Sequence, residues 1–298
     1  MVSSVSAQSD SRSSGSVAPS PLSAGSGSRG AGSSSATGGE QNVWAINDPA
    51  SAITLDHRPW DRFLKRYVVT DEDCLNRVCY GDVTCCDHKR LHRYLRYLQS
   101  VDTTTLNREE QMAYWFNLYN AKMVDIVLDN YRVRSVLKIK QDLFDLIGPF
   151  DDKTLCVMGK SLSLSDVENE IVRPVYGDPR IHYALNCASV GCPNLKKSAW
   201  RAETLDKDLD RAAYKFINSG RAVKSKALGR LWASKIYDWY KDDFGGDDKG
   251  VIRHLKKYAR PELRAELCGE CKIDKFSYNW SLNGCGHHNF SWVNLLLP

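Results

Sequence analysis

Residues 109–131, EEQMAYWFNLYNAKMVDIVLDNY, limit the possible folds more than any other part of the chain. They contain no proline or glycine, and Asn107 stands where a capping side chain would begin a helix of about six turns. Apolar residues recur on most faces of that helix, which is typical of a buried central helix. The main apolar stripe consists of Met112, Phe116, Tyr119, Met123 and Ile126.

A second stripe of the same helix is polar and includes Glu110, Asn117 and Asn120 at helical spacing. Because an unpaired buried polar group costs roughly 1–3 kcal/mol, these side chains need partners. We therefore expect the helix to be both the core of a domain and one wall of a polar site. Asn117 and Asn120 are candidate ligand-binding residues in that site.

The N-terminal residues 1–42 differ from the rest of the chain. Residues 1–40 include 15 serines and 7 glycines, with almost no large apolar residues. Such a segment cannot bury enough apolar surface to offset the entropy lost on ordering, which predicts a disordered tail. Residues 43–298 contain enough apolar and aromatic side chains for the core of one large domain.

The formal net charge is +5, but no continuous basic stripe or nucleic-acid motif accompanies it, so we expect no nucleic-acid partner. The chain has no apolar run long enough to span a membrane and no secretory signal. We expect a cytoplasmic or organellar protein whose partner is a protein or a small molecule. Ten cysteines in such a chain favour reduced thiols or a metal site over a disulfide scaffold.

The pattern predicts an α+β fold: a mostly helical single domain with a small sheet packed around the long helix. We expect further helices from Pro59 and at residues 88–99, 143–147, 165–173, 202–217, 236–244 and 250–258. Short strands are expected at residues 155–158, 161–164, 180–187, 228–233 and 273–280.

The segment RIHYALNC alternates as a strand does, and places Arg180, His182 and Asn186 on one face. His182 is a candidate base or a structural histidine, and Arg180 and Asn186 are candidate ligand-binding residues. A cysteine nucleophile needs a neighbouring histidine, but Cys187 is five residues from His182 and would face the other way in a regular strand. Cys187 is either a nucleophile past the strand end or a buried apolar residue, and Cys192 is the more exposed alternative nucleophile.

Glu110 and Glu168 are candidate acid–base residues, because burial would raise the pKa of one carboxyl group towards neutrality. Each has a structural alternative. Glu168 stands where it would close a capping box with Ser165, and Glu110 lies in the first turn of the long helix, where an acidic side chain is stabilising.

The cysteine- and histidine-rich residues 268–288 have zinc-like spacing. Cys268 and Cys271 form a CxxC pair, and Cys285 and His287 follow after a predicted strand and turn. This pattern makes zinc a candidate cofactor, with cysteines that bind no metal as the alternative. A second group without standard spacing contains Cys74, Cys79, Cys85, Cys86 and His88.

Four motifs occur in one order: AYWFNLYNA, LSLSDVE, RIHYALNCAS followed by Cys192-Pro193, and YNWSLN. Together they resemble the domain-of-unknown-function family numbered 547, over about residues 60–283. The resemblance implies a fold more than an activity, because the family is functionally unassigned. The positions that match the family's motifs are Asn117, Asn120, Glu168, Arg173, His182, Cys187 and Cys192.

Two positions depart from the family's pattern. The family usually has histidine where this chain has Asn169, and aspartate where it has Asn279. If that aspartate orients a catalytic histidine in the family, Asn279 would stabilise the wrong tautomer here.

Two functions fit these residues. One is a non-catalytic module that binds a partner or small ligand through a buried polar site, with Arg173 among the binding residues. The other is a thiol-dependent hydrolase or transferase, with Cys187 or Cys192 as nucleophile and His182 as base, and with a helix amide stabilising the oxyanion. Whether the chain is an enzyme is left open by the sequence.

Overall fold

The computed structural model describes residues 42–139, 148–226, 229–267 and 271–285. The predicted tail up to residue 41 and the predicted helical piece at residues 143–147 lie outside this range. Within it, helices predominate and the strands form small separate sheets, which confirms the α+β fold class.

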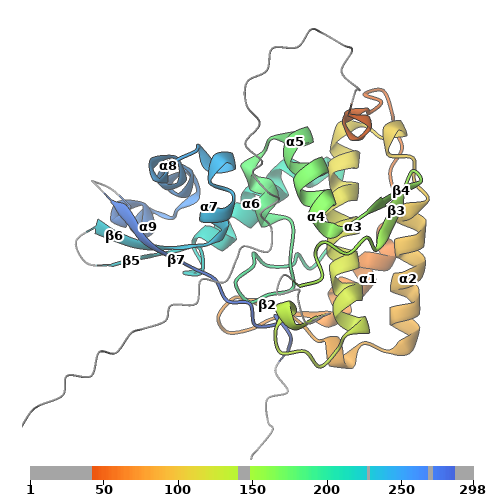
Figure 1. Cartoon of the computed structure of the whole chain (residues 1–298), viewed down its shortest axis with the longest axis horizontal. Coiled ribbons are helices and arrows are strands. Elements are labelled where there is room, and N and C mark those ends of the chain that lie inside the picture. Colours follow the sequence, from red (N-terminus) through yellow and green to blue (C-terminus); the bar gives the residue numbers. More distant parts are fainter. Residues whose placement is uncertain (1–41, 140–147, 227–228, 268–270, 286–298) are drawn as a thin grey trace, which may run out of the picture.

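Helix α3, Arg108–Asp129, is the central helix of the domain. Its first turn is capped by Asn107, whose side chain accepts a hydrogen bond from the backbone N–H of Glu110, as the sequence predicts. Most of its side chains are buried. Helix α1 (Arg58–Tyr67) packs on α2 (Cys85–Gln99), and α2 lies beside α3 (Figure 1).

The strands are short and antiparallel with one exception. β1 (Val68–Thr70) pairs with β2 (Asn76–Val78), and β3 (Leu155–Val157) pairs with β4 (Lys160–Leu162). The third sheet has the order β5-β6-β7, formed by Val223–Ser225, Arg230–Ser234 and Lys272–Ser277. In it β6 pairs antiparallel with β5 and parallel with β7. The described residues thus contain three small sheets, where the sequence predicts one.

One helix before the third sheet and three helices between its strands β6 and β7 complete the C-terminal part. α6 is Leu205–Ile217, α7 is Ile236–Trp239, α8 is Asp248–Tyr258 and α9 is Pro261–Glu266. Short 3₁₀ helices link the elements: η1 (Val43–Ala45), η2 (Tyr80–Asp82), η3 (Thr103–Thr105), η4 (Val136–Lys138), η6 (Pro179–Tyr183), η7 (Ala202–Thr204) and η9 (Lys241–Phe244).

One helical segment near the middle of the chain begins earlier than the sequence predicts. The capping box is formed by Ser163 and Asp166, not by Ser165 and Glu168. α4 (Leu164–Asp166), the π-helix η5 (Val167–Val172) and α5 (Arg173–Tyr176) then follow without a break. Because Asp166 closes the cap, the carboxylate of Glu168 is available for another role, and π-turns are frequent at functional sites.

The expected strand at residues 180–187 is absent. Asp178 caps a 3₁₀ helix instead: its side chain accepts from the backbone N–H of Arg180 at 2.8 Å, and Pro179 fixes the first turn. The residues that follow, up to Cys187, are irregular. The alternating pattern was misleading because side-chain hydrogen bonds from other elements, described below, satisfy this backbone in place of a neighbouring strand.

The buried apolar side chains form two adjoining cores. The larger surrounds α3, and the smaller lies among α6, α7, α8 and the third sheet. Figure 1 shows these two groups of elements on opposite sides of the molecule. Helix η6 lies at their junction, because Ile181 belongs to the larger core and Tyr183 to the smaller.

Candidate functional site

His182 stands between those two residues, and its imidazole is almost fully buried at the junction of the cores. Its Nε2 lies 2.7 Å from Oδ2 of Asp243 in η9, and its Nδ1 lies 3.7 Å from Oε1 of Glu168. Tyr240 stacks on the ring with the centroids 4.0 Å apart. A histidine with a carboxylate near each ring nitrogen is therefore assembled from elements of both cores.

Glu168 connects this histidine to the central helix. The hydroxyl of Tyr119 in α3 donates to Oε2 of Glu168 at 3.3 Å. Burial, together with the nearby charge of Glu168, raises the pKa of both Tyr119 and Tyr240, so both phenols are protonated at neutral pH.

Arg173 closes the cluster on the other side of Asp243. Its Nε and Nη2 donate to the two carboxylate oxygens of Asp243 at 2.7 and 3.0 Å, and its Nη1 donates to Oδ1 of Asn169 at 3.0 Å. Burial alone would raise the pKa of Asp243, but the hydrogen bonds from His182 and Arg173 hold it well below its usual range. Asp243 is thus an ionised acceptor at neutral pH. We call Glu168, Arg173, His182, Tyr240 and Asp243 the junction cluster.

Cys187 and Cys192 form a separate pair of thiols. Their sulfur atoms lie 3.1 Å apart, and the Sγ of Cys187 also lies 3.1 Å from both the Ser189 and the Tyr278 hydroxyl. Burial raises the pKa of the Cys187 thiol, but its hydrogen bonds with Cys192, Ser189 and Tyr278 outweigh burial and lower the pKa below its ordinary value. Burial and the neighbouring Cys187 raise the pKa of Cys192.

His182 and Cys187 are not paired as base and nucleophile. The ring nitrogens of His182 face Asp243 and Glu168, whereas the sulfur of Cys187 faces Cys192, Ser189 and Tyr278. The expectation that the two residues would point in different directions holds, although the strand on which it was based is absent.

The side chains of the three candidate amide residues form hydrogen bonds with backbone groups of other segments. Asn117 donates to the carbonyl and accepts from the N–H of Trp200, both at 2.9 Å. Asn120 donates to the carbonyl of Ala184 at 2.9 Å and accepts from the N–H of Asn186 at 2.8 Å. The side chain of Asn186 in turn donates to the carbonyl of Pro193 at 2.7 Å. These bonds occupy the donors and acceptors predicted to face a ligand.

Glu110 and Arg180 lie outside the junction cluster. Oε1 of Glu110 accepts from the backbone N–H of Leu55 at 2.7 Å, and burial raises the pKa of this carboxyl group. On α3, Glu110 precedes the Glu168 contact at Tyr119 by nine residues, about 13 Å of helix, so the two carboxylates do not form a pair. Arg180 makes ion pairs with Asp178, Asp206 and Asp210.

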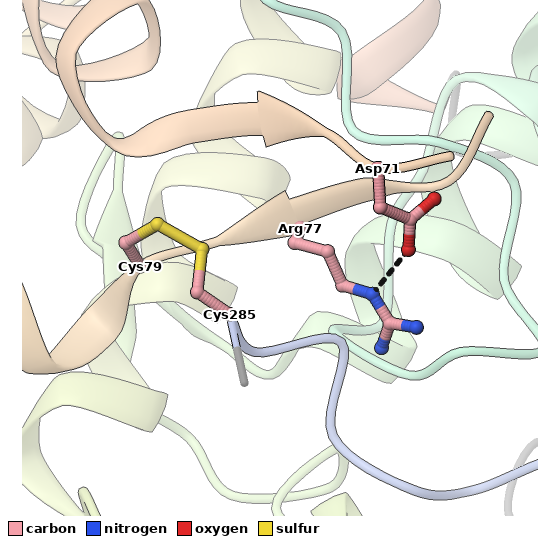
Figure 2. Close-up of a disulfide and its surroundings, with 4 residues drawn as sticks. All are labelled: Asp71, Arg77, Cys79 and Cys285. Atoms are coloured by element: carbon pink, nitrogen blue, oxygen red, sulfur yellow. Dashed lines mark hydrogen bonds and ion pairs between the residues drawn. A yellow bond between two sulfur atoms is a disulfide. The ribbon is translucent and has the colours of Figure 1, made fainter. Parts of the chain in front are cut away.

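The predicted C-terminal zinc site must be corrected at Cys285. Cys285 forms a disulfide with Cys79, and a disulfide sulfur is not the thiolate that binds zinc (Figure 2). The expectation of reduced thiols is therefore wrong for these two cysteines. Cys271 is partly exposed, while Cys268 and His287 lie outside the described residues.

Asp243 and Tyr240 are the site residues that the sequence analysis missed. Their segment, WYKDDF, resembles an ordinary amphipathic turn, and no spacing within it indicates a contact with a histidine 61 residues away. Asn279, which was expected to affect a histidine tautomer, instead accepts from the backbone N–H of Ser281 at 2.9 Å. Asp243 is the carboxylate that orients His182.

The fold and the site together define an α+β domain with a partly buried charged cluster between two cores. Residues 103–217 match the family model described as "Protein of unknown function, DUF547", which confirms the family resemblance over that segment. The YNWSLN motif lies outside the match. The matched segment contains Glu168, Arg173, His182 and both thiols of the buried pair, but ends before Asp243. Searches of curated proteins and of solved structures gave no match. Among the described residues, no helix is long and apolar enough to cross a membrane.

Proposed function

We propose that this DUF547-like module binds a small hydroxyl-bearing ligand at the junction cluster. One observation carries the proposal. In the described part of the chain, four buried side-chain nitrogen or oxygen atoms have no hydrogen-bond partner in the protein, and two of them, Nδ1 of His182 and the Tyr240 hydroxyl, belong to this cluster. A buried polar atom without a hydrogen-bond partner destabilises the folded state unless a ligand or an ordered water molecule supplies that partner.

The hydrogen-bonding roles of these two atoms define the ligand chemistry. Because ionised Asp243 can only accept, Nε2 of His182 donates to it, and in the tautomer that carries a single proton on Nε2 the other nitrogen, Nδ1, is an acceptor. The protonated Tyr240 hydroxyl is a donor. A hydroxyl group can donate to Nδ1 and accept from the phenol at once, so it matches both.

The charges of the cluster favour a cationic or neutral ligand. Glu168 and Asp243 contribute two carboxylates, and Arg173 offsets one of them. The side chains of Arg173 and Asp243 are each 26% exposed, whereas those of His182 and Glu168 are almost fully buried, so the cluster meets solvent at Arg173 and Asp243. Sites between two packed units are also common places for small ligands. An amino alcohol is the simplest compound that combines these properties.

The test uses ethanolamine as the probe and ethylamine, which lacks the hydroxyl, as the matched control. We expect ethanolamine to give saturable shifts of the His182 ring signals in NMR spectra of the full chain, and ethylamine to give none. Tyr240→Phe removes only the phenol oxygen, and should weaken ethanolamine binding about tenfold or more. Equal responses to both amines, or no response to either, would show that the cluster is only a structural network.

A thiol-dependent enzyme is the second candidate, favoured by the hydrogen bonds that lower the pKa of Cys187. Its test is labelling of the native protein with iodoacetamide over a pH series, read for each cysteine by mass spectrometry. Exposed Cys156 is the reference thiol. A reactive thiolate would make Cys187 label rapidly well below pH about 8.5, whereas protection of Cys187 up to that pH would exclude it as a nucleophile.

A further inference from the structure

Two histidines and two aspartates converge on the side of the central helix that faces α2. His88 and His92 are four residues apart on α2, and Asp125 and Asp129 are four residues apart on α3. Residues at this spacing share one face of a helix, and α2 packs against α3. One potential ligand atom from each of the four side chains lies within 4.8 Å of the others.

We propose that these four side chains form a binding site for a divalent transition-metal ion of the zinc class, which links α2 to α3. This site is distinct from the C-terminal cysteine pattern and from the junction cluster. In the sequence His88 stands near four cysteines, whereas in the structure it faces the carboxylates of α3.

The distances between the side-chain atoms suit one shared ion. Nε2 of His88 lies 3.0 Å from Oδ1 of Asp125 and 3.8 Å from Oδ1 of Asp129, and Nε2 of His92 lies 2.7 Å from the same Asp125 oxygen. Nitrogen and oxygen ligands at about 2.0–2.2 Å from a tetrahedral zinc ion stand roughly 3.3 Å apart. Small side-chain movements would therefore complete a tetrahedral set.

The surroundings of Asp125 resemble the outer shell of a metal site. Its carboxylate is 4% exposed, and its second oxygen, Oδ2, accepts from Nζ of Lys122 at 2.9 Å. This contact holds the carboxylate so that Oδ1 faces the two imidazoles, as outer-shell partners of metal ligands do. The side chains of His92 and Asp129 are 41% and 55% exposed, which leaves an entry path for an ion.

The ligand types select the kind of metal. Calcium and magnesium prefer oxygen ligands alone, whereas two imidazoles with two carboxylates suit zinc and its first-row neighbours. The competing explanation is a hydrogen-bonded His–Asp–His group without metal. In that case both imidazoles donate to the same oxygen of Asp125, and Asp129 has no need to face them.

The test is titration of the full chain, without a histidine tag and freed of metal by chelation, with zinc and with cobalt. We expect one equivalent of zinc to bind in calorimetry, and cobalt to give a visible spectrum without thiolate charge-transfer bands. His92→Gln and Asp129→Asn should each weaken zinc binding about tenfold or more, because each removes one ligand. Both positions are exposed enough that folding, checked by circular dichroism, should be preserved.

Cys271→Ser is the matched control for binding through the C-terminal thiols, and should bind zinc as the unmodified chain does. The proposal is overturned if His92→Gln and Asp129→Asn bind zinc with unchanged affinity. It is equally overturned if the unmodified chain binds no zinc at equimolar metal, since the four side chains would then form only a hydrogen-bonded group.

Discussion

Ala188 adopts a backbone conformation that alanine rarely adopts, with φ at +59°. Its N–H donates to Oδ1 of Asn186 at 3.0 Å, and its carbonyl accepts from the N–H of Asn283 at 2.9 Å. The left-handed conformation costs an L-residue about 1–2 kcal/mol. One local hydrogen bond to Asn186 and one long-range hydrogen bond from Asn283 therefore maintain this strained conformation directly beside Cys187, as is often seen next to functional groups.

Ala188→Gly should relieve that strain. We expect the free energy of unfolding to stay unchanged or to rise by up to about 1 kcal/mol, because the relief offsets the entropy that glycine adds to the unfolded chain. The control is Ala113→Gly in α3, where the alanine is equally buried but has an ordinary helical conformation. This control should lower the free energy of unfolding by about 1 kcal/mol. Urea unfolding measures both, and equal losses would contradict the strain at Ala188.

His57 and His254 make stability depend on pH. Burial, the largest cause, lowers the pKa of each to about 4 in the folded chain, against an ordinary value of 6.5. Between these pH values the unfolded state binds more protons, so stability rises with pH and is complete above about 6.5. We expect the free energy of unfolding to fall by about 2 kcal/mol per histidine from pH 7 to pH 5.

The measurement is urea unfolding at pH 5, 6 and 7, compared with His57→Gln and His254→Gln. Each variant lacks one titrating group and should show a shallower pH dependence, even where its stability at pH 7 is lower. If the slope persists in both single variants and in the double variant, other groups are responsible for it.

At the scale of elements, α3 stabilises the fold because its buried amide side chains form hydrogen bonds with the backbone of segments that have no regular secondary structure. Asn117 holds both backbone polar groups of Trp200, and its amide nitrogen also lies 3.3 Å from Nε2 of His57. The opposite nitrogen of that imidazole lies 2.7 Å from the Tyr94 hydroxyl. The helix thus ties the N-terminal segment and the chain after η6 to one rigid element.

A double-mutant cycle should locate this network. Asn117→Ala and His57→Ala should each lose about 2 kcal/mol or more, because each leaves buried partners unsatisfied, and their coupling energy should exceed about 0.5 kcal/mol. Asn117→Ala and His182→Ala should be additive within that limit, because these residues belong to different clusters. Strong coupling of Asn117 with His182 would show that the two clusters form one network.

The elements that the sequence predicts well are those specified by local pattern. α3 has the period, the cap and the composition of a buried helix, and the structure confirms all three. The segment from Pro179 to Cys187 fails because its conformation depends on distant partners, Asn120 above all, which alternation along the chain cannot reveal. Likewise the sequence assigns Glu168 to a capping box because both Ser163 and Ser165 are followed three residues later by an acidic residue. The structure uses Ser163 with Asp166.

The candidate site follows the same rule. Sequence patterns identified Glu168, Arg173 and His182, but not Asp243, which comes from the other core and lies beyond the matched family segment. The proposed metal ligands form one pair at helical spacing on α2 and a second pair on α3. Only the packing of the two helices brings the pairs together.

At the scale of the whole molecule, residues 283–285 are bonded to residues 78–80, in and directly after β2. Val78 in β2 donates to the carbonyl of Asn283 and accepts from the N–H of Cys285, both at 3.0 Å. The Tyr80 hydroxyl also donates to Oδ1 of Asn283 at 2.9 Å. The disulfide between Cys79 and Cys285 lies next to these bonds, and Figure 2 shows it near the ion pair of Arg77 with Asp71.

This disulfide joins residues 206 positions apart, so it restricts the unfolded chain strongly. Reduction, or Cys285→Ser combined with Cys79→Ser, should lower the free energy of unfolding by about 2–5 kcal/mol. The matched control is Cys156→Ser, which replaces an exposed free thiol and should change stability by less than about 0.5 kcal/mol. Urea unfolding with and without reductant measures the effect. The folded state should persist after reduction, because the hydrogen bonds of Val78 and Tyr80 do not depend on the disulfide. If the free energy of unfolding is the same with and without reductant, the disulfide is absent in solution.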